Sequence, residues 1–152
     1  MLVASTLLSS AAVASSAGGD MLDQESPSAS GQSQTYFQDR SRDARGQRVT
    51  MAGVTLLMPE AEIQKRTTVQ DLAAFVKTAE ASASRVLELN PSAMSARVQF
   101  ECRVARCGIK LATKGDVEKT VRQALQDALV KLPPLKTSGE VHFQVEFRVA
   151  AR

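Results

Sequence analysis

Hydrophobic and polar residues alternate with a period of two in three segments of the C-terminal half of the chain. Residues 97–104 and 107–111 flank Ala105-Arg106, where we expect a tight turn, and residues 141–149 alternate over nine positions. A period of two is typical of a strand with one buried face. The apolar positions change parity across the turn, as they must if a hairpin keeps both apolar sets on one face. The pattern therefore predicts a β-hairpin and a later third strand.

Apolar residues at steps of three and four predict two amphipathic helices. The first follows Thr67 or Thr68, either of which suits the N-cap position, and ends at Asn90-Pro91 because the residue before a proline avoids helical geometry. The second covers about residues 117–131, between the hairpin and the last strand.

Short signals mark the ends of these elements. Asp116 is a suitable N-cap for the second helix, and Pro133 stops it. Further upstream, Pro59 with acidic residues after it indicates another helix start. The apolar run 54–58 is either an extra strand or an extended lead-in to that helix.

These elements predict an α+β fold with a small three-stranded antiparallel sheet and two helices on one face. The strand order is 2-1-3, so the hairpin's first strand lies in the centre and the last strand lies at an edge. We prefer antiparallel pairing because the outer face is strongly polar, which suits a sheet wetted on one side. An edge strand has free N–H and C=O groups.

The chain divides into three parts by composition. Residues 1–19 carry no charge and are rich in Ala, Ser, Leu and Val, which resembles an export signal, although the basic n-region is missing. Residues 20–50 are polar, and we expect a disordered tether because they have little to bury. Residues 51–152 form the single α+β domain, organised around 97–149. We expect a periplasmic or secreted protein.

The charge balance does not indicate a nucleic-acid partner. The 152-residue chain has a net charge of +3, and from Arg97 onward eleven Lys/Arg stand against six Asp/Glu. However, the charges alternate in sign along the strands, and no aromatic residues are interleaved for base stacking. We expect a solvated face, with no nucleic-acid partner and no stable membrane span.

The only two cysteines, Cys102 and Cys107, lie on either side of the turn. In an exported protein this spacing favours a disulfide that closes the hairpin, and free core thiols or a reactive pair are the alternatives. Zinc would need more ligands, and the only histidine, His142, is placed by parity on the opposite face. The chain has no nucleophile elbow, phosphate-binding loop or metal motif, so we expect neither a catalytic residue nor a cofactor.

The order helix, strand, turn, strand, helix, strand resembles the C-terminal domain of TonB-like energy transducers. The residues that carry the resemblance are the 97–111 hairpin, Ala124-Leu125, the prolines after Leu132, and Gly139 to Phe147. It covers about the last 90 residues. In that family the last strand pairs with a short peptide of an outer-membrane transporter, which implies a contact on residues 141–149 here.

The resemblance leads to a non-catalytic binding module that captures a partner segment by strand addition at its last strand. The partner-binding residues would be Val141, Phe143, Gln144, Val145, Glu146, Phe147 and Arg148. The alternative is an envelope inhibitor or immunity-type protein that blocks a secreted enzyme with its polar sheet face or with the hairpin tip, residues 103–106.

Overall fold

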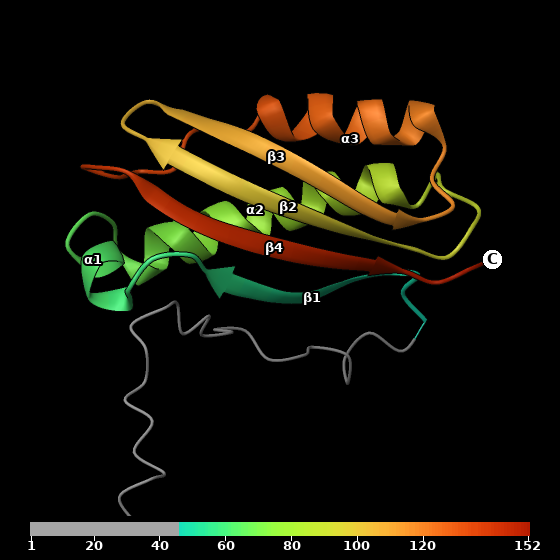
Figure 1. Cartoon of the computed structure of the whole chain (residues 1–152), viewed down its shortest axis with the longest axis horizontal. Helices are drawn as coiled ribbons and strands as arrows, with labels where there is room; N and C mark the ends of the chain where they lie inside the picture. The colour runs from blue at the N-terminus through green and yellow to red at the C-terminus, as the bar shows by residue number, and fades with distance from the viewer. Residues whose placement is uncertain (1–45) are drawn as a thin grey trace, which may run out of the picture. The chain divides into compact units, whose positions relative to one another are not determined.

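The computed structural model describes residues 46–152, and the predictions for residues 1–45 lie outside the described part. The elements follow in the order β1 (Val49–Leu56), α1 (Glu60–Gln64), α2 (Val69–Leu87), β2 (Met94–Arg103), β3 (Arg106–Gly115), α3 (Lys119–Val130) and β4 (Val141–Val149). The strands form one antiparallel sheet in the order β1-β4-β2-β3. The two longer helices, α2 and α3, pack together on the same side of this sheet (Figure 1).

The prediction of a three-stranded sheet is wrong, because β1 adds a fourth strand beside β4. Val49 pairs with Val149 and Leu56 pairs with Phe143. A β-bulge between Met51 and Gly53 shifts the register within β1, so this strand lacks the period of two that marks the others. The three predicted strands keep their order, since β3, β2 and β4 are successive neighbours.

The buried face of the sheet holds the core. Phe100 on β2 and Phe143 on β4 stack with their ring centroids 5.1 Å apart. Phe75 of α2 meets both rings edge-on, at 5.3 Å and 5.8 Å. Leu125 of α3 is fully buried in the same cluster, and Ile109 of β3 packs against it. These strand and helix residues therefore share one hydrophobic core.

Polar contacts satisfy the N-terminal ends of α2 and α3. The contact at α2 was predicted, and the one at α3 was not. The Thr68 hydroxyl caps α2 by accepting from the Asp71 N–H at 3.0 Å, as its position suggested. The prediction that Asp116 caps α3 is wrong. Instead the Glu118 N–H donates to Oδ1 of Asn90 at 3.3 Å. Asn90 is distant in sequence and fully buried.

The turn of the hairpin lies one residue earlier than predicted. Arg103 pairs with Arg106, so the two turn residues are Val104 and Ala105. Ala105 has a positive φ of 68°, which a residue other than glycine rarely adopts.

Candidate partner-binding site

The predicted partner-binding residues lie in the centre of the sheet rather than at its edge. Strand β4 pairs with β1 on one side and with β2 on the other. Val141, Phe143, Val145 and Phe147 are fully buried beneath the helices. The backbone of β4 therefore has no free edge, and the expected edge position of the last strand is wrong. The sequence did not identify β1 as the outer neighbour of β4, because the bulge in β1 interrupts the alternation of apolar and polar residues.

The disulfide between Cys102 and Cys107 is present, with an S–S distance of 2.04 Å. The two residues are directly opposite on β2 and β3, one pair below the turn. Cys102 is fully buried, and Cys107 packs against the core. The disulfide therefore links β2 and β3 next to the hairpin tip, on the face of the sheet that packs against the core. In the described residues, no group of three or more His, Cys, Asp or Glu side chains could hold a metal ion.

Charged side chains on the helix-free face of the sheet pair with one another. Nε2 of His142 lies 2.7 Å from Oε1 of Glu140, and a guanidinium nitrogen of Arg103 lies 3.3 Å from the same oxygen. The hydrogen bond from His142, followed by that from Arg103, holds the pKa of Glu140 below its ordinary value. Lys110 likewise bonds Glu101 and lowers the pKa of that carboxyl.

The third carboxylate of this face, Glu146, lies between two arginines. Its oxygens are 3.8 Å from Arg97 and 3.6 Å from Arg148. Each of the carboxylates Glu101, Glu140 and Glu146 on this face is therefore paired with at least one cation. Exposed pairs of this kind contribute little stability. Neither the hollow beside β1 nor the one beside α2 is lined by these side chains, so we do not place the site on this face.

Neither of two hollows in the described part is lined by His142. One has a volume of about 190 Å³ and lies between α2 and the loop at Pro133-Pro134. The other has a volume of about 40 Å³ and lies beside β1. Small-molecule sites are commonly larger, at roughly 300–1,000 Å³. The expectation of a non-catalytic protein stays a prediction.

The two edges of the sheet differ in charge. Strand β3 carries Arg106, Lys110 and Lys114 on the helix-free face, and cationic side chains of this kind discourage edge-to-edge pairing. Strand β1 has no charged residue at all in its sequence VTMAGVTL. Within residues 46–152 no strand pairs with the outer side of β1. The β1 edge is therefore the one more suited to strand addition.

The backbone groups at this open edge follow from the neighbouring hydrogen bonds. The Leu57 N–H donates to the His142 carbonyl at 3.1 Å, so the backbone N–H and C=O groups of Leu57 point toward β4. Because successive residues of an antiparallel strand face opposite sides, the N–H and C=O groups of Leu56 and Val54 point outward. At the other end the Ala150 N–H donates to the Arg48 carbonyl at 2.8 Å. The same alternation turns the backbone of Met51 outward, before the bulge.

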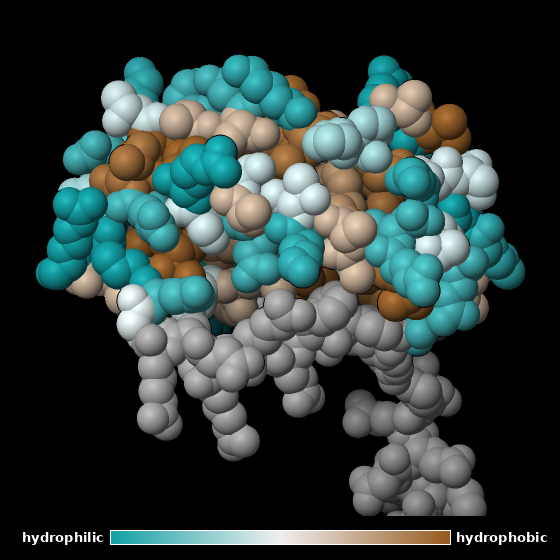
Figure 2. Space-filling view, turned by 180° about the vertical axis from the view of Figure 1, so that it is seen from behind, coloured by the Kyte–Doolittle hydropathy of each residue, from teal (hydrophilic) through white to brown (hydrophobic). Residues whose placement is uncertain are grey.

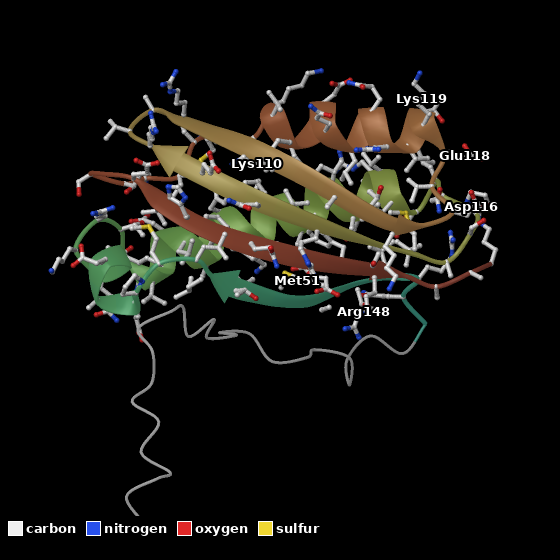
Figure 3. The ribbon with its side chains drawn as sticks, viewed as in Figure 1. Met51, Lys110, Asp116, Glu118, Lys119 and Arg148 are labelled. Carbon is white, nitrogen blue, oxygen red and sulfur yellow. A yellow bond between two sulfur atoms is a disulfide. The ribbon has the colours of Figure 1, made fainter. Side chains whose placement is uncertain are left out.

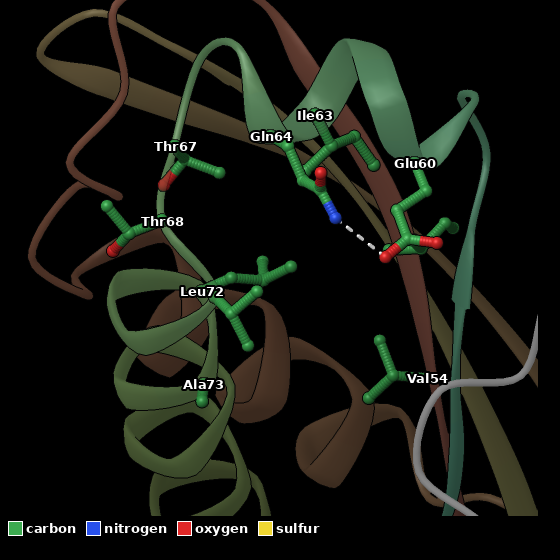
Figure 4. A pocket seen from close by; sticks show the side chains of 10 residues that line it. Val54, Glu60, Ile63, Gln64, Thr67, Thr68, Leu72 and Ala73 are labelled. Carbon is green, nitrogen blue, oxygen red and sulfur yellow. Dashed lines mark hydrogen bonds between the residues drawn. The ribbon is translucent and has the colours of Figure 1, made fainter.

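An apolar hollow lies beside this edge, on the helix side of the sheet (Figure 4). Val54 and Leu56 of β1 form one wall, and Ile63 of α1 and Leu72 of α2 form the others. At the rim, Nε2 of Gln64 donates to Oε1 of Glu60 at 2.8 Å. The side chains of Val54 and Leu56 point into the sheet's buried face, so the inward side chains of an added strand would lie on this same side.

Local contacts fix the walls of the hollow. The Thr67 hydroxyl donates to the carbonyl of Lys136 at 2.7 Å, and a guanidinium nitrogen of Arg66 donates to the Glu140 carbonyl at 2.5 Å. The N–H of Ser138 donates to the Arg66 carbonyl at 2.8 Å. These bonds attach the α1–α2 connection to the loop before β4, so the hollow is preformed.

Other exposed hydrophobic residues of the described part do not gather into one surface. Seen from the helix side, hydrophobic residues alternate with hydrophilic ones (Figure 2). Val69 begins α2, Leu89 follows its other end and Val130 ends α3, and each is more than half exposed. Single exposed hydrophobic residues are ordinary on protein surfaces. These three residues therefore indicate no docking face on the helix side of the sheet.

No protein-family model matches the chain, and no curated protein and no solved structure matches it. The resemblance to TonB C-terminal domains therefore stays a prediction that rests on the residues alone. In the part of the chain that the structure describes, no helix is long and apolar enough to cross a bilayer. The disulfide is compatible with a location outside the cytoplasm, where such bonds persist.

Proposed function

We propose that this chain is a non-catalytic binding module, exported to the periplasm or secreted, that captures an extended segment of a partner protein at the open edge of β1. The captured segment becomes a fifth strand, and one of its aliphatic side chains occupies the hollow beside Val54 and Leu56. Backbone hydrogen bonds supply affinity in this mode, and the side-chain hollow supplies selectivity.

The observation that carries the proposal is the coincidence of an uncharged open edge with an adjoining apolar hollow. Val54 and Leu56 belong to both, since their backbone groups face outward and their side chains line the hollow. The hollow's small volume, about 40 Å³, suits a side chain better than a metabolite. The resemblance to TonB C-terminal domains implies the same mode of capture, with the paired strand here being the first rather than the last.

A random peptide library displayed on phage tests the proposal with a defined probe. We expect full-length protein to select peptides in which apolar residues alternate with polar ones. On binding, the selected peptides should shift the NMR amide signals of Met51, Val54 and Leu56 and protect these amides from hydrogen exchange. Changes confined to β3 or to the helices would contradict capture at β1.

Met51→Pro and Met51→Leu form a matched pair for this experiment. Proline removes the outward N–H, and edge strands and bulges tolerate it, so the fold should persist. We expect Met51→Pro to weaken peptide binding by about tenfold or more, since at least one backbone hydrogen bond is lost and the ring obstructs pairing. Met51→Leu retains the N–H and a similar volume, and should bind like wild type. Equal binding by both variants would refute the proposal.

A further inference from the structure

The tip of the β2–β3 hairpin, residues 103–106, has a composition that the turn itself does not require. Two-residue hairpin turns favour Asn-Gly or other glycine-containing pairs, because their backbone needs positive φ angles. Here the pair is Val104-Ala105, and Ala105 adopts a φ of 68°. Ala105 does not suit this turn, since alanine is disfavoured in the left-handed region, whereas Val104 has no positive φ and fits its position.

A hydrophobic residue stands at the most exposed point of this tip. Val104 is 62% exposed, although valine is usually buried. Sequences that depart from local folding rules tend to do so at functional sites. The tip therefore combines an unfavourable turn with an exposed aliphatic side chain, and folding explains neither.

The disulfide holds this unfavourable turn in place. Cys102 and Cys107 form the cross-strand pair next to Arg103 and Arg106. Their disulfide therefore links the two strands at the base of the turn. A recognition loop that is rigid before binding loses less conformational entropy when it binds.

Two arginines flank the exposed valine. Arg103 and Arg106 are paired across the turn, and both are exposed. Arg103 lies 3.3 Å from Glu140, whereas Arg106 makes no salt bridge within the described residues. The chemistry of the tip is therefore cation, aliphatic group, cation.

We propose that residues 103–106 form a second interaction surface, a preformed prong that inserts Val104 into an apolar pocket of a partner protein whose rim carries carboxylates. Arginine pairs with carboxylates through two parallel hydrogen bonds, which fixes orientation as well as adding affinity. The positive charge of the tip also accelerates encounter with an acidic surface. This surface belongs to the β2–β3 hairpin and does not depend on capture at β1.

Site-specific photocrosslinking identifies the partner. The full chain carries benzoylphenylalanine at position 104, or at Val130 of α3 as a control that is similarly exposed, at 59%. Both proteins are irradiated in extract of the source organism, and mass spectrometry maps the crosslinked peptide. We expect position 104 alone to give one dominant product, mapped next to Asp or Glu residues of that protein. Equal products from both positions, or no product at 104, would overturn the proposal.

Val104→Asn combined with Ala105→Gly separates recognition from folding. Asn-Gly suits the turn better than Val-Ala, so the melting temperature should stay the same or rise. Binding to the purified crosslinked protein should nevertheless fall by about tenfold or more, the value of one buried aliphatic group. Arg106→Glu should lower the association rate and weaken its dependence on salt. Wild-type binding by the Asn-Gly variant would refute the prong, whatever the result at β1.

Discussion

The side-chain amide of Asn90 donates a hydrogen bond of 3.0 Å to the carbonyl of Asp116. Asn90 follows α2 and is fully buried, whereas Asp116 precedes α3 and is exposed. The same amide donates to the Ser92 carbonyl at 2.9 Å, and Oδ1 accepts from the N–H of Glu118. One side chain thus joins the end of α2 to the start of α3, where Figure 3 labels Asp116 and Glu118.

Asn90→Ala should lower the free energy of unfolding by about 2–3 kcal/mol, because it removes three partly buried hydrogen bonds. Urea denaturation followed by circular dichroism measures this change. The control is Ser92→Ala, which removes only an exposed hydroxyl bond of 3.3 Å to Asp116 and should change stability by less than about 0.5 kcal/mol. Similar losses of stability for both variants would show that the Asn90 side chain does not hold the end of α2 to the start of α3.

Gly115→Ala should destabilise the fold by about 2 kcal/mol or more, since a Cβ there combines backbone strain with a clash. Gly115 has a φ of +102°, and its added Cβ would lie 2.8 Å from the Ala93 carbonyl oxygen. Gly108→Ala on the same strand is the control, because its Cβ would meet only the Glu101 oxygen, at 3.8 Å. Thermal melts should show a large fall for Gly115→Ala and almost none for Gly108→Ala.

Replacing both Cys102 and Cys107 with serine should cost about 2 kcal/mol of stability, the value that chain entropy predicts for so short a loop. Denaturation with and without dithiothreitol measures the effect. Reductant should lower the wild-type midpoint and leave the double variant unchanged. A wild-type midpoint that does not respond to complete reduction, checked by thiol labelling, would contradict a stabilising role for the bond.

The ion pairs of the helix-free face should make stability depend on acid pH. Glu140 has a pKa below its ordinary value of 4.5 because it accepts hydrogen bonds from His142 and Arg103. A carboxyl whose pKa is lower in the folded state contributes its full stability above its unfolded pKa. That contribution declines as the pH falls through the folded pKa.

Glu140→Gln should therefore flatten the loss of stability below about pH 4.5, the ordinary value for glutamate. Denaturation midpoints between neutral and acid pH give the slope. Carbon-detected NMR of Glu140 in the wild type should also place its midpoint below that value. In Arg103→Ala the midpoint should move upward, toward the ordinary value. An unchanged midpoint would show that Arg103 does not act on this carboxyl.

Contacts between residues close in sequence were predictable. The period of two located β2, β3 and β4, and the three- and four-residue steps located α2 and α3. The disulfide followed from two cysteines on either side of a turn, and the Thr68 cap followed from Asp71 three residues later. In each case the partners lie within a few residues, so the local pattern contains both members of the interaction.

The tertiary structure alone decided which strands lie at the edges of the described sheet. The sequence determined that 141–149 is a strand with one buried face, but not that β1 occupies its outer side, since Val49 and Val149 meet only when the ends of the domain fold together. It likewise did not place Asn90 against Asp116 and Glu118. Periodicity specifies which face of an element is buried, whereas pairing between distant segments depends on how the whole core packs. For that reason the edge at which we propose strand addition is the first strand rather than the last.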